Sequence, residues 1–161
     1  MGIDVQATST GNLPTMTALE NARSDISDYM TQVLTDKQKL VLIKQRIPDK
    51  PFPYPIREYS DKSKKDGICK RSCQQAWLEK YDFLAYSKKE DGLYCLSCVL
   101  FPTVARNGVR SSQLLSKPFR DWKGAISYIN SHSTLDYHRQ SMGMMSDDSI
   151  QRNHRKPKQA H

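Results

Sequence analysis

The sequence predicts a small α+β fold, and three observations support this prediction. Apolar residues recur at helical spacing in several stretches, and two short apolar runs flank an Asp-Gly pair typical of a β-hairpin. A segment with four prolines separates the first helical stretch from the rest of the chain. At 161 residues, the chain has the length of one domain with flanking segments. We therefore expect short helices around one hairpin.

The N-terminal part of the chain changes from polar to amphipathic near residue 23. Residues 1–22 are threonine-rich and without periodicity, which predicts a disordered segment. Residues 23–47 are predicted to form amphipathic helices, with Ser24 as N-cap of the first helix and Thr35 opening a capping box for the second, which Pro48 ends. The apolar stripe of the first helix consists of Ile26, Tyr29, Met30, Val33 and Leu34. Such a stripe predicts packing on the following module or on a protein partner.

Residues 48–71 are predicted to form a proline-rich and basic linker. Prolines disfavour helix and central strand, so the first part of this segment is expected to be extended and to place Phe52 and Tyr54 on the module. Several cations follow, interrupted by aspartates, and a run of this kind is typical of a solvated surface. These cations are Lys62, Lys64, Lys65, Lys70 and Arg71.

The predicted module spans 72–145 and begins with a helix and a hairpin. We expect a helix over 72–81, with Ala76, Trp77 and Tyr81 on one side, and a strand over 83–86. Asp91-Gly92 predicts a two-residue type I′ turn, because both central residues of that turn need a positive φ. The returning strand then leads into a knuckle with Cys95 and Cys98, after which residues 99–101 lead out to Pro102 and a loop.

Two helices are predicted in the second half of the module. From Pro118, apolar residues recur at steps of three and four and place His132 on the same face, which predicts one helix. Ser133 and Asp136 resemble the start of a second helix, which would carry His138. The apolar residues of the first helix are Phe119, Trp122, Ile126 and Ile129. The basic segment 146–161 is predicted to be a disordered tail.

Two cysteines and two histidines predict a metal site. The two residues between Cys95 and Cys98 let both thiolates face one ion, and His132 and His138 have a helix-compatible spacing. Thiolate and imidazole ligands in a closed tetrahedron are typical of structural zinc, so we predict one Zn²⁺ held by these four residues. A closed site has no open position for a substrate, which argues against hydrolytic chemistry. A module with a thin core would depend on this metal for its stability.

Two other interpretations of the cysteines remain open. A Cys-x-x-Cys redox pair would need a thioredoxin-like setting, whereas the surrounding sequence predicts a hairpin followed by a loop. A second possible quartet combines Cys95 and Cys98 with the more loosely spaced Cys69 and Cys73. No secretory signal is recognisable, so we expect a reducing environment, in which metal ligation is commoner than disulfides.

The charge balance favours an acidic partner. The chain has 25 Lys plus Arg against 17 Asp plus Glu, a net charge of +8, which is typical of proteins that bind nucleic acid or an anionic membrane surface. No apolar run approaches the ~20 residues that a bilayer requires. The candidate nucleic-acid-binding residues lie between Pro102 and Gly124, and they are Arg106, Arg110, Lys117, Arg120 and Lys123.

A longer pattern of aromatic and metal-ligating residues extends from about residue 52 to residue 142. It consists of Arg71, Cys73, Gln74, Leu78, Tyr81, Leu84, Tyr86, Ser87, Gly92, Tyr94, Cys95, Cys98, Phe101, Lys117, Pro118, Phe119, Asp121, Trp122, Ile126, His132, His138 and Met142. This pattern resembles the TTF-type zinc finger of hAT-family transposases and of zinc finger MYM-type relatives. In this resemblance Cys95, Cys98, His132 and His138 match the family's ligand positions.

The resemblance implies a zinc-dependent DNA-binding module of a transposase-derived protein. Those transposases continue into a catalytic core with spaced carboxylates, for which this sequence has no counterpart, so we expect neither an enzyme nor a small-molecule substrate. Duplex DNA is the expected partner, and a nuclear location follows from it. The alternative is a zinc-stabilised protein-interaction module of a nuclear or chromatin-associated protein, with 24–47 as the binding segment.

Overall fold

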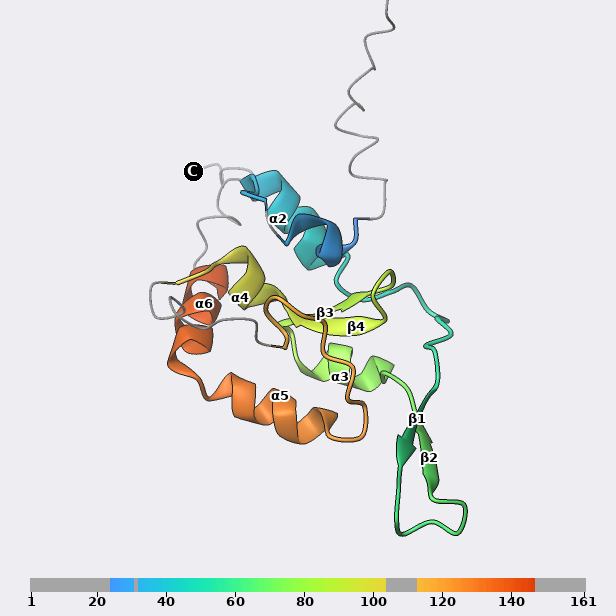
Figure 1. Cartoon of the computed structure of the whole chain (residues 1–161). Coiled ribbons are helices and arrows are strands. Elements are labelled where there is room, and N and C mark those ends of the chain that lie inside the picture. The colour runs from blue at the N-terminus through green and yellow to red at the C-terminus, as the bar shows by residue number, and fades with distance from the viewer. Residues whose placement is uncertain (1–23, 31, 104–112, 147–161) are drawn as a thin grey trace, which may run out of the picture.

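The computed structural model describes residues 24–30, 32–103 and 113–146 of the chain (Figure 1). The fold is α+β, as predicted, with two antiparallel hairpins and short helices around them. The expectations of disorder for 1–22 and for nearly all of 146–161 fall outside these residues. Within the described ranges, no helix is both long enough and apolar enough to cross a membrane.

A buried hairpin forms the centre of the fold. Strand β3 (Leu84–Ser87) pairs with β4 (Gly92–Cys95), and every residue of both strands is buried. The outer edge of β4 also pairs with the irregular segment 113–119, because Leu93 and Phe119 exchange two main-chain hydrogen bonds of 2.9 Å. The helices around the hairpin are α3 (Gln75–Lys80), α4 (Leu96–Leu100), α5 (Ala125–Ser133) and α6 (Asp136–Ser146).

Two apolar clusters flank this hairpin. The larger cluster joins α3, the hairpin and α5, and its members include Leu78, Phe83, Leu93, Phe119, Trp122 and Ile129. The second joins the N-terminal helices to β4 and α4, through Ile26, Leu42, Tyr94, Leu96, Leu100 and Phe101. Because the hairpin contributes side chains to both clusters, it connects all the helices into one folded unit.

The N-terminal segment packs on this unit and is less helical than predicted. Its first element is a single 3₁₀ turn, η1 (Ile26–Tyr29), capped by Asp25 and not by Ser24. The predicted stripe does not continue, since Val33 is 100% exposed. Asp25 also accepts a hydrogen bond from Ser87 Oγ (2.7 Å), which ties η1 to the central hairpin and directs the chain away from a longer helix.

The capping box predicted at Thr35 is confirmed, and it opens α2 (Asp36–Lys44), which ends before Pro48. Arg46, just after this helix, holds it to the central unit. Its Nη1 donates to the carbonyl oxygens of Leu78 (2.6 Å), Tyr81 (3.3 Å) and Leu84 (3.2 Å). One guanidinium therefore satisfies main-chain acceptors at the end of α3 and at the start of β3.

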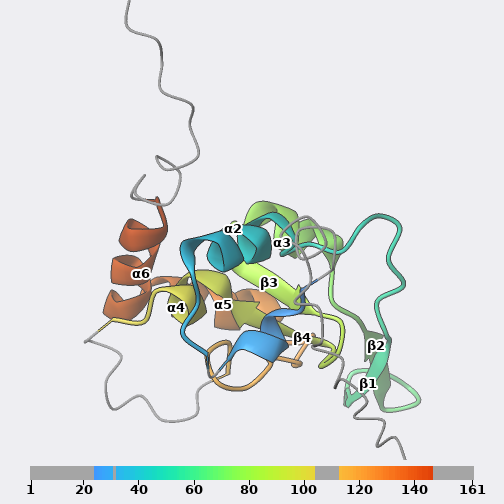
Figure 2. The same ribbon diagram turned by 90° about the horizontal axis from the view of Figure 1, so that it is seen from above.

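The segment 48–71 contains a hairpin that the sequence analysis missed. Strands β1 (Arg57–Ser60) and β2 (Ile68–Arg71) pair antiparallel, and they lie at the opposite end of the molecule from α6 (Figures 1 and 2). The missed signals were the Asp66-Gly67 pair, whose glycine has φ +71°, and apolar residues on facing strands. The expected packing of Phe52 and Tyr54 is confirmed, since both rings contact Tyr86 edge-on at centroid distances of 5.6 and 4.9 Å.

The predicted type I′ turn at Asp91-Gly92 is wrong. Asp91 has a positive φ of 44°, but Gly92 does not, and Gly92 already pairs with Ser87 as the first residue of β4. The glycine is required for a different reason. A Cβ at this position would lie 2.4 Å from Pro118 Cβ, so Gly92 permits the 113–119 segment to approach the hairpin.

Three helix predictions also need correction. In α3 the buried residue is Leu78, whereas Ala76 is exposed. Helix α5 begins at Ala125 and not at Pro118, because residue 119 is held by pairing with β4. Ser133 does not cap α6, because it is the last residue of α5 and its hydroxyl donates to the Asn130 carbonyl (2.6 Å).

Candidate metal centre

Four side chains from four elements of the fold meet beside the central hairpin. Cys95 is the last residue of β4, and Cys98 lies in the five-residue helix α4 that follows directly. His132 is near the end of α5 and His138 is near the start of α6. The chain that follows Cys95 is thus helical, where a hairpin followed by a loop was expected.

The connections between these elements explain why the four side chains converge. The main-chain N–H of Leu135 donates to the His132 carbonyl (3.1 Å), which makes a tight corner between α5 and α6. The buried hydroxyl of Ser141 in α6 donates to the Phe101 carbonyl (2.8 Å) just after α4. These two contacts place both imidazoles against the two thiols.

The distances fit tetrahedral coordination of one ion. The four candidate ligand atoms lie within 4.8 Å of one another. Cys95 Sγ is 3.3 Å from His138 Nδ1, and Cys98 Sγ is 3.6 Å from both His132 Nε2 and His138 Nδ1. Ligand bonds of about 2.3 Å to sulfur and about 2.0–2.1 Å to nitrogen place the two atoms about 3.6 Å apart in a tetrahedron. The arrangement can therefore hold a metal ion with little movement.

The cluster is shielded from solvent. Both cysteines have 0% exposure, and His132 and His138 have 4% and 3%. The ring of Phe83 contacts His138 edge-on, with a centroid distance of 4.5 Å. The hydroxyl of Ser97 lies 3.2 Å from Cys95 Sγ and can donate to it when that sulfur is a thiolate. Burial of this kind makes an unpaired charge costly, so two thiolates here require a cation.

The protein environment itself favours only one thiolate. Hydrogen bonding from Cys95, with further contributions from His132 and His138, lowers the pKa of the Cys98 thiol. Burial, and then the neighbouring Cys98, raise the pKa of Cys95 well above its ordinary value. A bound divalent cation would remove this difference, because it stabilises both sulfurs in the deprotonated form.

The alternative quartet with Cys69 and Cys73 does not form. Cys69 lies on β2 opposite Tyr59, and Cys73 belongs to the larger apolar cluster, so neither joins the four ligand atoms. Burial, followed by the charge of Asp91, raises the pKa of Cys73, which makes it a neutral buried thiol. All four cysteines are free of disulfides.

The predicted nucleic-acid-binding residues are placed unevenly. Arg106 and Arg110 lie outside the described residues. Lys117 and Lys123 are exposed, and Lys123 Nζ donates to the Ser60 carbonyl of β1 (2.9 Å). Arg120 is engaged by one acid, since its Nη2 lies 2.9 Å from Glu90 Oε2.

Comparison of this chain with protein families, with curated proteins and with solved structures finds no match.

Proposed function

We propose that this chain is a zinc-stabilised DNA-binding module of a transposase-derived, nuclear protein, related to the TTF-type finger and without catalytic activity. The observation that carries the proposal is the buried cluster of two cysteines and two histidines. Two sulfur and two nitrogen ligands in tetrahedral geometry favour Zn²⁺ over Mg²⁺ or Ca²⁺, which prefer oxygen ligands. The complete ligand set supports a structural zinc, as in other zinc-dependent nucleic-acid-binding modules.

The proposed DNA surface is centred on the β1–β2 hairpin. The connection between its strands carries Lys62, Lys64 and Lys65, all exposed and none of them in an ion pair with a described acid. The two acids in this connection serve the turn: Asp61 accepts from Ser63 N (3.0 Å), and Asp66 accepts from Ile68 N (3.1 Å). The lysines are therefore free to approach phosphates, and a two-stranded ribbon has the width to enter the major groove.

Two of the residues expected from the sequence extend this surface. Lys123 contacts β1 and continues the basic hairpin onto the start of α5, and Lys117 lies exposed on the segment before it. Arg120 contributes less to phosphate binding in this proposal, because Glu90 already pairs with it. Arg106 and Arg110 remain part of the proposal on their charge alone.

The protein-interaction alternative has less support. The main apolar side chains of 24–47, Ile26 and Leu42, are each only 3% exposed, because they pack on the central unit. A partner would have to bind what remains of this segment, and its exposed surface is mostly polar.

The proposal is tested by titrating the zinc-loaded protein with labelled duplex DNA at several salt concentrations. Each phosphate contact contributes about −0.9 to the slope of log K against log salt, so replacing Lys64 and Lys65 by Gln should make the slope shallower by about 2. The matched control replaces the exposed Lys37 and Lys44 of α2, which lies away from the hairpin (Figure 1), and should leave the slope unchanged. Absent or salt-insensitive binding by the zinc-loaded chain would refute the proposed function.

A further inference from the structure

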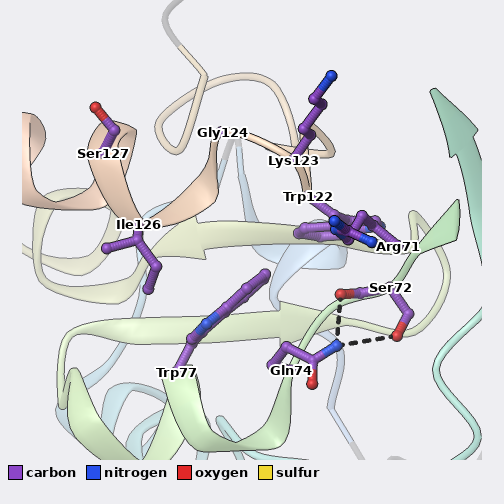
Figure 3. Close-up of a pocket in the computed structure, with 9 residues that line it drawn as sticks. All are labelled: Arg71, Ser72, Gln74, Trp77, Trp122, Lys123, Gly124, Ile126 and Ser127. Atoms are coloured by element: carbon purple, nitrogen blue, oxygen red, sulfur yellow. Dashed lines mark hydrogen bonds between the residues drawn. The ribbon is translucent and has the colours of Figure 1, made fainter. Parts of the chain in front are cut away.

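A pocket of about 620 Å³ opens between the junction of β2 with α3 and the start of α5 (Figure 3). This volume lies within the range of about 300–1,000 Å³ that is typical of small-molecule sites. The pocket is separate from the metal centre, since none of the four metal-ligating residues lines it. It lies at the foot of the basic hairpin, because Arg71, one of its lining residues, is the last residue of β2.

One side of the pocket is aromatic. Trp77 is half-buried and projects from α3 into the space below Ile126, which is 40% exposed on the opposite wall (Figure 3). Beside it, Trp122 is buried, with its ring centroid 6.2 Å from that of Trp77 and the two planes inclined by 41°. Packing against Trp122 limits the movement of Trp77, so its free face forms a fixed flat surface.

The rim of the pocket carries two cations. Arg71 Nη1 donates to the Lys70 carbonyl (3.1 Å), and Lys123 Nζ donates to the Ser60 carbonyl (2.9 Å). Neither forms an ion pair with an acid in the described ranges. The carboxylate of Asp121 lies near this rim but accepts from Gly124 N (3.3 Å), at the beginning of α5. Both cations therefore remain available to an anionic group of a ligand.

One residue that lines the pocket carries an unpaired donor. Trp122 lines the pocket, is 2% exposed, and its Nε1–H finds no hydrogen-bond partner within the described part of the chain. Helix α5 has no side-chain cap, and two residues of its first turn, Ile126 and Ser127, line the pocket. Main-chain N–H groups of a first helical turn have no partner within the helix, so they favour an anionic or acceptor-rich ligand.

We propose that this pocket binds one unpaired nucleotide of DNA, with its base stacked on Trp77 and its phosphate between Arg71 and Lys123. The inference rests on the proposed DNA-binding function and deepens it. A nucleotide combines a planar base with an anionic phosphate, which matches an aromatic wall beside a cationic rim. A duplex bound along the hairpin would bring such a nucleotide to the pocket wherever a base is unpaired or displaced.

The test compares a short oligothymidylate with a duplex of the same length, using the zinc-loaded chain. Replacing Trp77 by Leu should weaken oligothymidylate binding by roughly 5- to 150-fold, the range expected for one lost stacking contact. Duplex affinity should change by less than about twofold, because phosphates dominate that contact. Trp77→Phe keeps an aromatic face and should restore most of the single-strand affinity, which separates stacking from a general loss of structure. Lys44→Gln, on α2, serves as the unaffected control.

Tryptophan fluorescence gives a second readout. Oligothymidylate should quench the emission of the wild-type chain, and the Trp77→Leu variant should lose most of this quenching. Two results would refute nucleotide binding in the pocket and leave the proposed function intact. In the first, Trp77→Leu binds the oligothymidylate as tightly as the wild type does. In the second, the wild type binds the duplex but not the single strand. A wild-type chain that binds neither DNA would overturn both.

Discussion

Replacing Cys98 by Ser tests whether the metal centre stabilises the fold. Cys98 is fully buried, and its sulfur lies 3.6 Å from a nitrogen of each imidazole. The matched control is Cys73→Ser, because Cys73 is also buried, at 1% exposure, but lies outside the cluster. Both variants put the same hydroxyl into a buried position, and only one removes a metal-binding sulfur.

The expected magnitude follows from the four-ligand geometry. Structural zinc contributes about 10–16 kcal/mol of apparent binding free energy at neutral pH, so an equal share for each of four ligands is about 2.5–4 kcal/mol. This corresponds to roughly 10²- to 10³-fold weaker zinc binding. A small domain has a total stability of about 5–15 kcal/mol, so Cys98→Ser should unfold a large part of the population at low zinc concentration. Cys73→Ser should lose about 1–2 kcal/mol and keep its metal.

The assay measures metal content and thermal unfolding of both variants, with and without a chelator. We expect one zinc per chain in the wild type and in Cys73→Ser, and cooperative unfolding when the chelator removes it. Cobalt substitution should give the visible absorption of a tetrahedral thiolate–imidazole site in these two proteins and not in Cys98→Ser. Equal zinc binding by Cys98→Ser and the wild type, or equal loss in both variants, would contradict the assigned ligand set.

Three further substitutions test contacts away from the metal. Arg46→Ala should lower the free energy of unfolding, measured in urea, by about 2–4 kcal/mol, because three main-chain carbonyls lose their donor. Unchanged stability would show that water replaces the guanidinium as donor. Gly92→Ala should lower the melting temperature because the new Cβ would meet Pro118. The control Gly143→Ala has open space on α6 and should keep or raise the melting temperature. Equal effects of the two substitutions would contradict the close approach of Pro118 to Gly92. Asp25→Asn should cost about 1–2 kcal/mol. Burial alone would raise the pKa of Asp25, but the hydrogen bonds that its carboxylate accepts lower it. The stabilisation by this carboxylate is therefore fully present above the ordinary pKa of about 3.9, and it is lost as the pH falls through the lowered pKa. The difference between Asp25→Asn and wild type should therefore stay constant from about pH 8 to about pH 5 in chemical unfolding, and a decrease near pH 6 would contradict this assignment.

The sequence predicted those features that depend on local spacing. The capping box at Thr35 needs only a hydroxyl and an amide three residues apart, and the structure contains it. The sequence also predicted that Cys95, Cys98, His132 and His138 lie close together, because ligand chemistry restricts which residues can share an ion. The coarse α+β class follows from the same short-range patterns.

The features that the sequence missed depend on long-range contacts. The apolar residues that follow Pro118 have helical spacing, but the pairing of Phe119 with Leu93 keeps the first part of this segment extended. Gly92 looks like a turn residue in sequence, although its role is to admit Pro118. In each case a partner distant in sequence decides the local conformation, and no window of neighbouring residues contains that information.

Helix α5 provides a physical connection between the metal centre and the basic hairpin. Its C-terminal end carries His132, and the segment leading into its N-terminal end receives Tyr59 of β1. The hydroxyl of Tyr59 donates to the Arg120 carbonyl (2.6 Å) and accepts from Trp122 N (3.2 Å), so the hairpin is attached to the segment that α5 continues. Loss of a metal bound at His132 would remove one contact at the far end of α5, and the hairpin would then be held by Tyr59, by the hydrogen bond from Lys123 Nζ to the Ser60 carbonyl (2.9 Å) and by the ion pair of Arg57 with Asp91 (2.8 Å). A metal bound by these four residues would thus help to place the basic residues of the hairpin, although none of them lies near a ligand in the sequence.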